Sequence, residues 1–155
     1  MSMIVFSNDF DKAIAAFIIA SGAATMGMEV HMFFTFWATS ILRDPKRKVK
    51  GKKITEKMFE IMLPNGSEEL SLSKMNMMGV GTKMMKQIMK NQNVASLEEL
   101  IMLVREMDIK IHICDMSMSL MGLRKEELLF GDICEVCGIA AYLSYARKSK
   151  ISLFI

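Results

Sequence analysis

The sequence has few of the residues that hydrolases and disulfide-stabilised proteins need. Its 155 residues include two histidines, three cysteines and one tryptophan. Because only His31 and His112 are present and no Gly-x-Ser-x-Gly motif occurs, a serine-histidine-acid hydrolase is excluded. Three cysteines cannot all pair within one chain, and a domain of this length needs no disulfide framework. We therefore expect reduced thiols and a cytoplasmic protein.

The sequence also gives little indication of a membrane-spanning helix or a secretory signal peptide. The apolar run Ala13–Met28 holds 16 uncharged residues, whereas a bilayer-spanning helix needs roughly 20. Asp9 and Asp11 precede this run, where a signal peptide would be positively charged. We expect no signal peptide, and membrane association is not favoured.

Nucleotide-binding fingerprints are absent as well. Gly79-Val80-Gly81 is followed by Met84 at the position where a dinucleotide loop has its third glycine. Gly81-Thr82-Lys83 reverses the Gly-Lys-Thr order of a phosphate loop. The segment is predicted to be a turn between helices, and no bound cofactor is expected.

Methionine, in contrast, is abundant. There are 18 methionines in a composition that is 52% hydrophobic and 24% charged, which excludes a disordered chain. Methionine at helical spacing typically fills cores and interfaces, so we do not assign the clusters around Met77 and Met84 to Cu(I). The helix expected over residues 9–26 is apolar on nearly every face, which predicts a subunit interface and hence a homo-oligomer.

The net charge of +3 is unevenly distributed. Residues 43–57 carry +6, which leaves the rest of the chain at −3, so nucleic-acid binding is not expected. The segment 43–53 is predicted to be a solvated basic loop on one domain that spans residues 1–155. The cations of this segment could dock an anionic donor or an acidic protein, although a loop without a ligand is the simpler interpretation. The candidate docking residues are Arg43, Arg47, Lys48, Lys50, Lys52 and Lys53.

Hydrophobic periodicity predicts strands that alternate with helices. The expected strands are residues 3–7, 29–37, 109–114 and 149–155. The expected helices are residues 9–26, 54–63, 70–91, 96–107, 120–129 and 138–148. The helix over 70–91 is expected to be broken at residues 79–81. Ser96 and Glu99 have the spacing of a capping box. Such alternation is typical of an α/β fold with a parallel sheet covered on both faces.

Two cysteine-containing segments carry residue types that bind metals. His112 and Cys114 share one face of a strand, and Cys134 and Cys137 have a ligand-like spacing. A helix is expected between the two pairs, and one pair of this kind is weak support. We therefore assign no metal site.

The thiols remain the best candidates for chemistry. Cys114 ends a predicted strand and precedes Asp115-Met116-Ser117-Met118, at the sheet edge where ligands bind in parallel sheets. Backbone N–H groups that follow a cysteine favour its thiolate. A buried structural cysteine is about as common at such a position. Cys134 and Cys137 form a Cys-x-x-Cys pair before Gly138, which is a second candidate dithiol.

The segment from Cys114 to Gly122, with Arg124-Lys125-Glu126-Glu127-Leu128 after it, resembles the DsrE/DsrF/DrsH-like family, in its methionine-rich branch labelled sulfurtransferase or peroxiredoxin-like. The segments 15–24, 33–37, 77–79 and 138–143 are similar to the same branch. The resemblance implies a three-layer α/β/α fold with five parallel strands, a homo-oligomer and a persulfide on Cys114. Cys134 and Cys137 depart from the family pattern, and no Thr-x-x-Cys peroxide site is present.

We therefore interpret the chain as a sulfur-relay protein with Cys114 as the catalytic thiol. The expected partners are a sulfur donor, either a small anion or a persulfidated protein, and an acceptor sulfur-carrier protein. Residues that could line a pocket beside Cys114 are His112, Asp115, Met116, Ser117, Met118 and Met121. Two alternatives stay open: a dithiol-disulfide oxidoreductase that uses Cys134 and Cys137, and a non-catalytic oligomeric subunit.

Overall fold

The computed structural model describes residues 1–47, 49 and 54–155. Four lysines of the expected basic loop, Lys48, Lys50, Lys52 and Lys53, lie outside the described residues.

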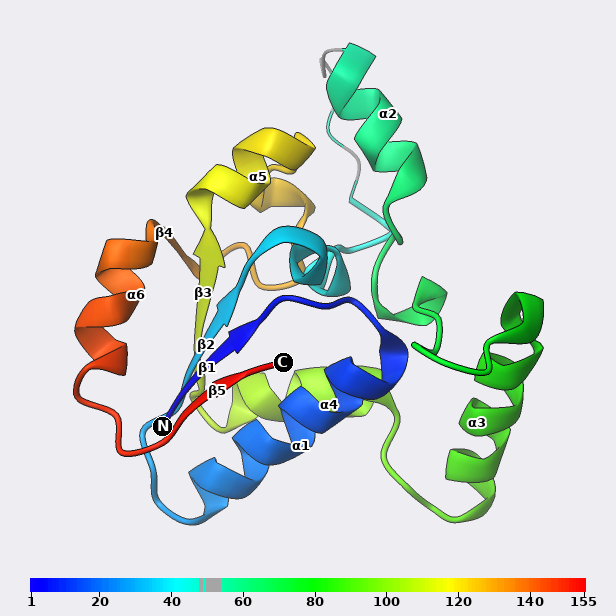
Figure 1. Ribbon diagram of the computed structural model, residues 1–155, viewed down its shortest axis with the longest axis horizontal. Coiled ribbons are helices and arrows are strands. Elements are labelled where there is room, and N and C mark those ends of the chain that lie inside the picture. The colour runs from blue at the N-terminus through cyan, green and yellow to red at the C-terminus, as the bar shows by residue number, and fades with distance from the viewer. Residues whose placement is uncertain (48, 50–53) are drawn as a thin grey trace.

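One five-stranded, wholly parallel sheet forms the centre of the fold (Figure 1). Its strand order is β4-β3-β2-β1-β5. The strands are β1 (Ser2–Val5), β2 (His31–Phe34), β3 (Lys110–Cys114), β4 (Glu135–Cys137) and β5 (Ser152–Phe154). The expected parallel sheet is thus confirmed, and β4, which periodicity did not reveal, is its fifth strand.

Helices cover both faces of the sheet. The α-helices are α1 (Phe10–Thr25), α2 (Ile54–Met62), α3 (Val80–Asn91), α4 (Leu97–Glu106), α5 (Asp115–Met121) and α6 (Ile139–Ala146). Short 3-10 helices are η1 (Phe36–Leu42), η2 (Ser67–Glu69), η3 (Met77–Gly79) and η4 (Lys125–Glu127). Helices α1 and α4 pack together on one side of the strands, and α6 lies on the other side against β1 and β2 (Figure 1). This is the expected three-layer α/β/α fold.

Alternation along the strands divides the interior into two clusters. Met32 and Phe34 of β2 point into the main core under α1 and α4, with Ile111 and Ile113 of β3 beside them. The intervening Phe33 faces α6 and packs with Cys114 and Tyr142 in a second, smaller cluster. Because side chains alternate between the two faces of a strand, His112 and Cys114 lie on the α6 side.

Several expected boundaries are wrong for local backbone reasons. The second strand stops at Phe34, because Phe36 has φ 47° and begins η1. The helix expected over 120–129 instead starts directly after Cys114 and ends at Gly122, whose φ is 64°. Positive φ at Met75 and Met77 keeps the start of the 70–91 segment from being helical. The capping box of Ser96 and Glu99 is present as expected.

Candidate functional site

Cys114 is the last residue of β3 and is followed at once by α5. Its side chain is only 5% exposed and packs with Phe33 and Tyr142. Because all five strands are parallel, this position lies at the carboxyl edge of the sheet, where ligands bind in open α/β folds. The structure thus places Cys114 where the sequence predicted it.

Polar groups surround the Cys114 sulfur. Burial raises the pKa of the Cys114 thiol, but hydrogen bonds from Ser117, from the Thr35 hydroxyl and from the Met116 backbone outweigh it, so that the pKa lies below its ordinary value. Hydrogen bonds to a thiolate favour the charged form, which is the nucleophilic form of cysteine. Cys114 is therefore a buried cysteine whose thiolate form is favoured by its neighbours.

The hydroxyls that hold this sulfur are themselves fixed. Ser117 Oγ lies 3.0 Å from Thr35 Oγ1 and accepts a hydrogen bond of 2.9 Å from the backbone N–H of Phe36. Phe36 also has a positive φ of 47°, a backbone strain of the kind that is common at functional sites. Thr35 and Phe36 were missed by sequence reasoning, because their nearness to Ser117 depends on the pairing of β2 with β3.

Cys137 is the sheet neighbour of Cys114. The two residues are paired in register on the parallel strands β3 and β4, and both contact the cluster of Phe33 and Tyr142. Burial, the charge of Glu135 and the charge of Cys114 raise the pKa of the Cys137 thiol. The two thiols thus lie together with opposite tendencies to ionise.

Cys134 does not share this site. It is 3% exposed and packs in the main core under α1 and α4, the opposite side of the sheet from Cys137. Burial raises the pKa of the Cys134 thiol. The Cys-x-x-Cys pair is therefore not brought together, because the chain enters β4 between its two members.

A chain of polar rings crosses the same face. His31 Nδ1 lies 2.9 Å from His112 Nε2, and Tyr145 of α6 stacks on both rings. Burial lowers the pKa of His112, the Glu135 carboxylate opposes this effect, and His31 adds to it. His112 Nδ1 lies 2.8 Å from Glu135 Oε2, in an orientation that does not make a hydrogen bond.

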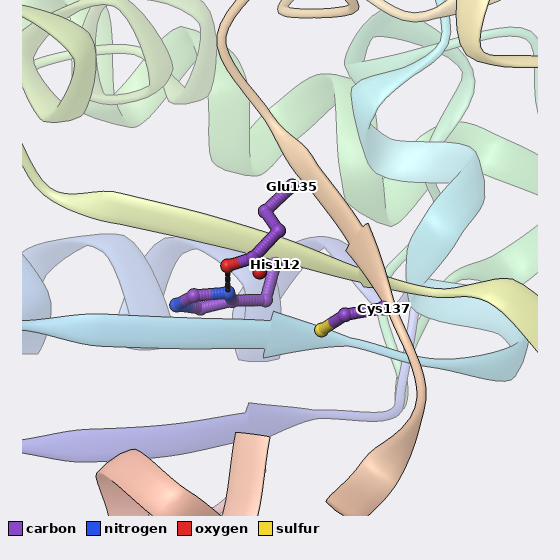
Figure 2. Close-up of side chains that lie close together, drawn as sticks. All are labelled: His112, Glu135 and Cys137. Atoms are coloured by element: carbon purple, nitrogen blue, oxygen red, sulfur yellow. Dashed lines mark ion pairs between the residues drawn. The ribbon is translucent and has the colours of Figure 1, made fainter. Parts of the chain in front are cut away.

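His112, Glu135 and Cys137 could hold a cation. One ligand atom from each residue lies within 4.8 Å of the other two. Figure 2 shows these three side chains close together. Imidazole, carboxylate and thiolate are all zinc ligands. This trio differs from the four-ligand set considered from sequence, because Glu135 replaces Cys134 and Cys114 is not a member.

The other expected pocket residues separate into three groups. Ser117 contacts Cys114, and His112 lies two residues before Cys114 on the same strand face. Met118 and Met121 belong to the main core, so the expectation that they line a pocket at Cys114 is wrong. Helix α5 turns them away from the sulfur, whereas Asp115 and Met116 are exposed.

Arg43 does not belong to an exposed docking surface. It is 4% exposed, and its guanidinium donates hydrogen bonds to the carbonyls of Leu63 and Pro64, at 3.2 and 3.1 Å. Arg47 is half exposed and pairs with Asp44 at 3.1 Å. The assignment of Arg43 to anion docking is therefore wrong, because its charge faces backbone carbonyls.

Surface features bear on the remaining expectations. No helix among the described residues is long and apolar enough to cross a membrane. Ten of the 18 methionines are exposed, among them Met75, Met77 and Met78 before α3. Core packing therefore accounts for a minority of the methionines, and their role at interfaces stays a prediction.

The chain is similar over its whole length to known proteins. It is 44% identical over 154 residues to the uncharacterized protein YrkE of Bacillus subtilis, covering 99% of this chain and 95% of YrkE. It is 36% identical over 160 residues to the sulfur carrier protein DsrE2 of Allochromatium vinosum, covering 100% and 97%. The crystal structure of the ychN protein from E. coli shares the fold, with a TM-score of 0.54, 7% identity and coverage of 100% and 99%.

A family model matches nearly every residue of the chain. The match runs over residues 1–154 and is described as the DsrE/DsrF/DrsH-like family. It includes the β3–α5 junction at Cys114, on which the sequence resemblance rested. The chain therefore belongs to the DsrE/DsrF/DrsH-like family.

Proposed function

We propose that this protein is a sulfur-relay carrier that holds sulfane sulfur as a persulfide on Cys114. The observation that carries the proposal is the placement of the Cys114 sulfur at the carboxyl edge of the sheet, hydrogen-bonded by Ser117 and Thr35 so that its pKa is lowered. The relative named as a sulfur carrier protein supports a sulfur-relay role in general.

The chemistry is two successive sulfur transfers. The Cys114 thiolate attacks the outer sulfur of a donor such as thiosulfate, the S–S bond of the donor breaks, and sulfite leaves with the electron pair. The thiolate of an acceptor then attacks the outer sulfur of the persulfide and releases Cys114 as a thiolate. Each step is an exchange at sulfur, which requires an ionised thiol and no bound cofactor.

The local polar groups suit both forms of the sulfur. The hydroxyls of Ser117 and Thr35 can donate to the thiolate and to the anionic persulfide. Low exposure of Cys114 protects a bound sulfur from bulk thiols and favours a small anion or an extended cysteine-bearing segment as partner. Such a relay needs a reducing compartment, so we place it in the cytoplasm.

We also propose assembly as a homo-oligomer. On the outer surface of α1, the neighbouring side chains of Ile18 and Ile19 are 48% and 40% exposed. Exposed aliphatic side chains on helices are typical of subunit contacts when they form one patch. Light scattering coupled to size exclusion tests this directly, and a strictly monomeric protein at high concentration would contradict it.

The sulfur-carrier proposal is tested by loading. The purified, reduced protein is incubated with thiosulfate or polysulfide, freed of excess reagent, and mapped by mass spectrometry of its peptides without reductant. We expect one added sulfur on the Cys114 peptide of Cys137→Ala, in which the neighbouring thiol on β4 cannot react with the bound sulfur. A folded Cys137→Ala protein that gains no sulfur on Cys114 from either reagent would overturn the proposal.

A further inference from the structure

Strand pairing in the sheet brings Cys114 and Cys137 next to each other. They are register partners on the adjacent parallel strands β3 and β4, so their side chains emerge on the same face. Neighbouring strands lie about 4.8 Å apart, within the Cα separation of about 4.4–6.8 Å that a disulfide spans. Both thiols contact the cluster of Phe33 and Tyr142.

We propose that Cys137 is the resolving thiol of Cys114, which discharges a bound persulfide as sulfide when no acceptor takes the sulfur. This inference rests on the proposed function, since it needs sulfur on Cys114. The sequence spacing had suggested a redox pair of Cys134 and Cys137. Here the partner of Cys137 is Cys114 instead.

The step balances without an external oxidant. The Cys137 sulfur attacks the inner sulfur of the Cys114 persulfide, and a Cys114–Cys137 disulfide forms as the persulfide S–S bond breaks. The electron pair leaves on the outer sulfur, which takes the thiol proton of Cys137 and departs as HS⁻. The sulfane sulfur is thereby reduced to sulfide, and the two cysteine sulfurs are oxidised. An external dithiol is required only to reopen the disulfide.

The environment of the pair favours this order of events. Hydrogen bonds from Ser117 and Thr35 favour the thiolate of Cys114, which can therefore attack a donor first. Cys137 lies beside Cys114 at the same edge of the sheet and can attack only after Cys114 has taken sulfur from a donor. Transfer to an acceptor then competes with attack by Cys137. Discharge is then the default fate of sulfur that no partner collects.

Cys134 provides a matched control within the same chain. It precedes Cys137 by three residues and is equally small, but it packs in the main core on the opposite side of the sheet. Its backbone N–H is bonded to the Phe130 carbonyl at 2.8 Å, which fixes this segment before β4 begins. For Cys134 to attack the Cys114 persulfide, its side chain would have to move from the main core to the other face of the sheet.

The experiment follows sulfide and disulfide together. Wild type, Cys137→Ala, Cys134→Ala and Cys114→Ala are loaded with polysulfide, freed of excess reagent and held anaerobically without acceptor. Released sulfide is measured over time, and non-reducing peptide maps identify the linked cysteines. Circular dichroism checks that each variant is folded, and Cys137→Ser serves as a second substitution at the site.

We expect wild type and Cys134→Ala to release close to one sulfide per loaded chain and to form the Cys114–Cys137 link. Both Cys137 variants should keep the persulfide, with sulfide no higher than in Cys114→Ala. Loading without this link, or equal sulfide release from the Cys137 variants, would overturn the resolving step alone. Failure of Cys114 to load in every variant would overturn the proposed function and the resolving step with it.

Discussion

Ser117 Oγ lies 3.0 Å from Thr35 Oγ1, and both hydroxyls contact the sulfur of Cys114. The two residues are 82 positions apart and meet only because β2 and β3 are neighbours in the sheet. Hydrogen bonds from these two hydroxyls lower the pKa of the Cys114 thiol and so oppose the rise that burial causes.

Removing these donors should raise the pKa of Cys114. In Ser117→Ala and Thr35→Val, the thiolate loses a hydrogen-bond donor while its burial is unchanged, so its ionisation moves to higher pH. The rate of alkylation of Cys114 by iodoacetamide, measured against pH, should shift upward in both variants. Ser144→Ala, an exposed hydroxyl on α6, is the control and should leave the profile unchanged. An unshifted profile in Ser117→Ala would show that the hydroxyl does not set the pKa.

Arg43 should matter for stability and Arg47 much less. Arg43→Met removes the donor to the Leu63 and Pro64 carbonyls, the first of them buried, which costs about 1–3 kcal/mol in the free energy of unfolding. Arg47→Met removes a half-exposed pair with Asp44, worth about 0–1 kcal/mol. Urea unfolding of both variants measures the difference. Equal losses would contradict the structural role of Arg43.

Two glycines should respond to alanine in opposite directions. Gly122 has φ 64°, and an added Cβ would lie 2.5 Å from Glu56 Cβ, so Gly122→Ala should cost more than the 1–2 kcal/mol that a left-handed residue costs. Gly22 lies inside α1 with no atom within 4 Å of its virtual Cβ, so Gly22→Ala should add about 0.5–1 kcal/mol of stability. Thermal unfolding distinguishes them, and destabilisation by Gly22→Ala would argue against an open site there.

The buried histidine predicts a pH dependence of folding. Burial first, and then His31, lower the pKa of His112 against the opposing effect of Glu135, so the neutral ring is favoured in the folded state. Below the unfolded value of 6.5, the unfolded chain binds a proton that the folded chain does not, and stability falls as the pH decreases. His112→Gln should flatten this slope in urea unfolding between neutral pH and about pH 5. An identical slope in the variant would place its origin elsewhere.

The strand-helix alternation was readable from the sequence because buried parallel strands and capped helices leave local patterns. The capping box at Ser96 and the strand that ends at Cys114 are such cases. Strand β4 was not found, because its three residues are too short for a period and two of them are Glu135 and Cys137. The end of the strand at Cys114 was predicted correctly, but the following helix was expected from residue 120, whereas α5 begins at Asp115.

The site was only partly predictable for a related reason. Cys114 could be found because it ends a strand, but its partners depend on which strands are neighbours. Thr35 comes from the end of β2, and Cys137 from the register of β4. Proximity in sequence instead favoured Cys134, which precedes β4, and Met118 of α5, and both pack in the main core.

The most direct test of the central claim is cyanolysis of the loaded protein. Cyanide attacks the outer sulfur of a persulfide and leaves with it as thiocyanate, returning the cysteine to its thiolate. Because Cys137 would otherwise discharge the sulfur, the measurement uses Cys137→Ala loaded with polysulfide and freed of excess reagent. We predict close to one thiocyanate per chain from this variant and none once Cys114→Ala is added to it. Equal thiocyanate from both proteins would contradict a sulfur carrier that acts through Cys114.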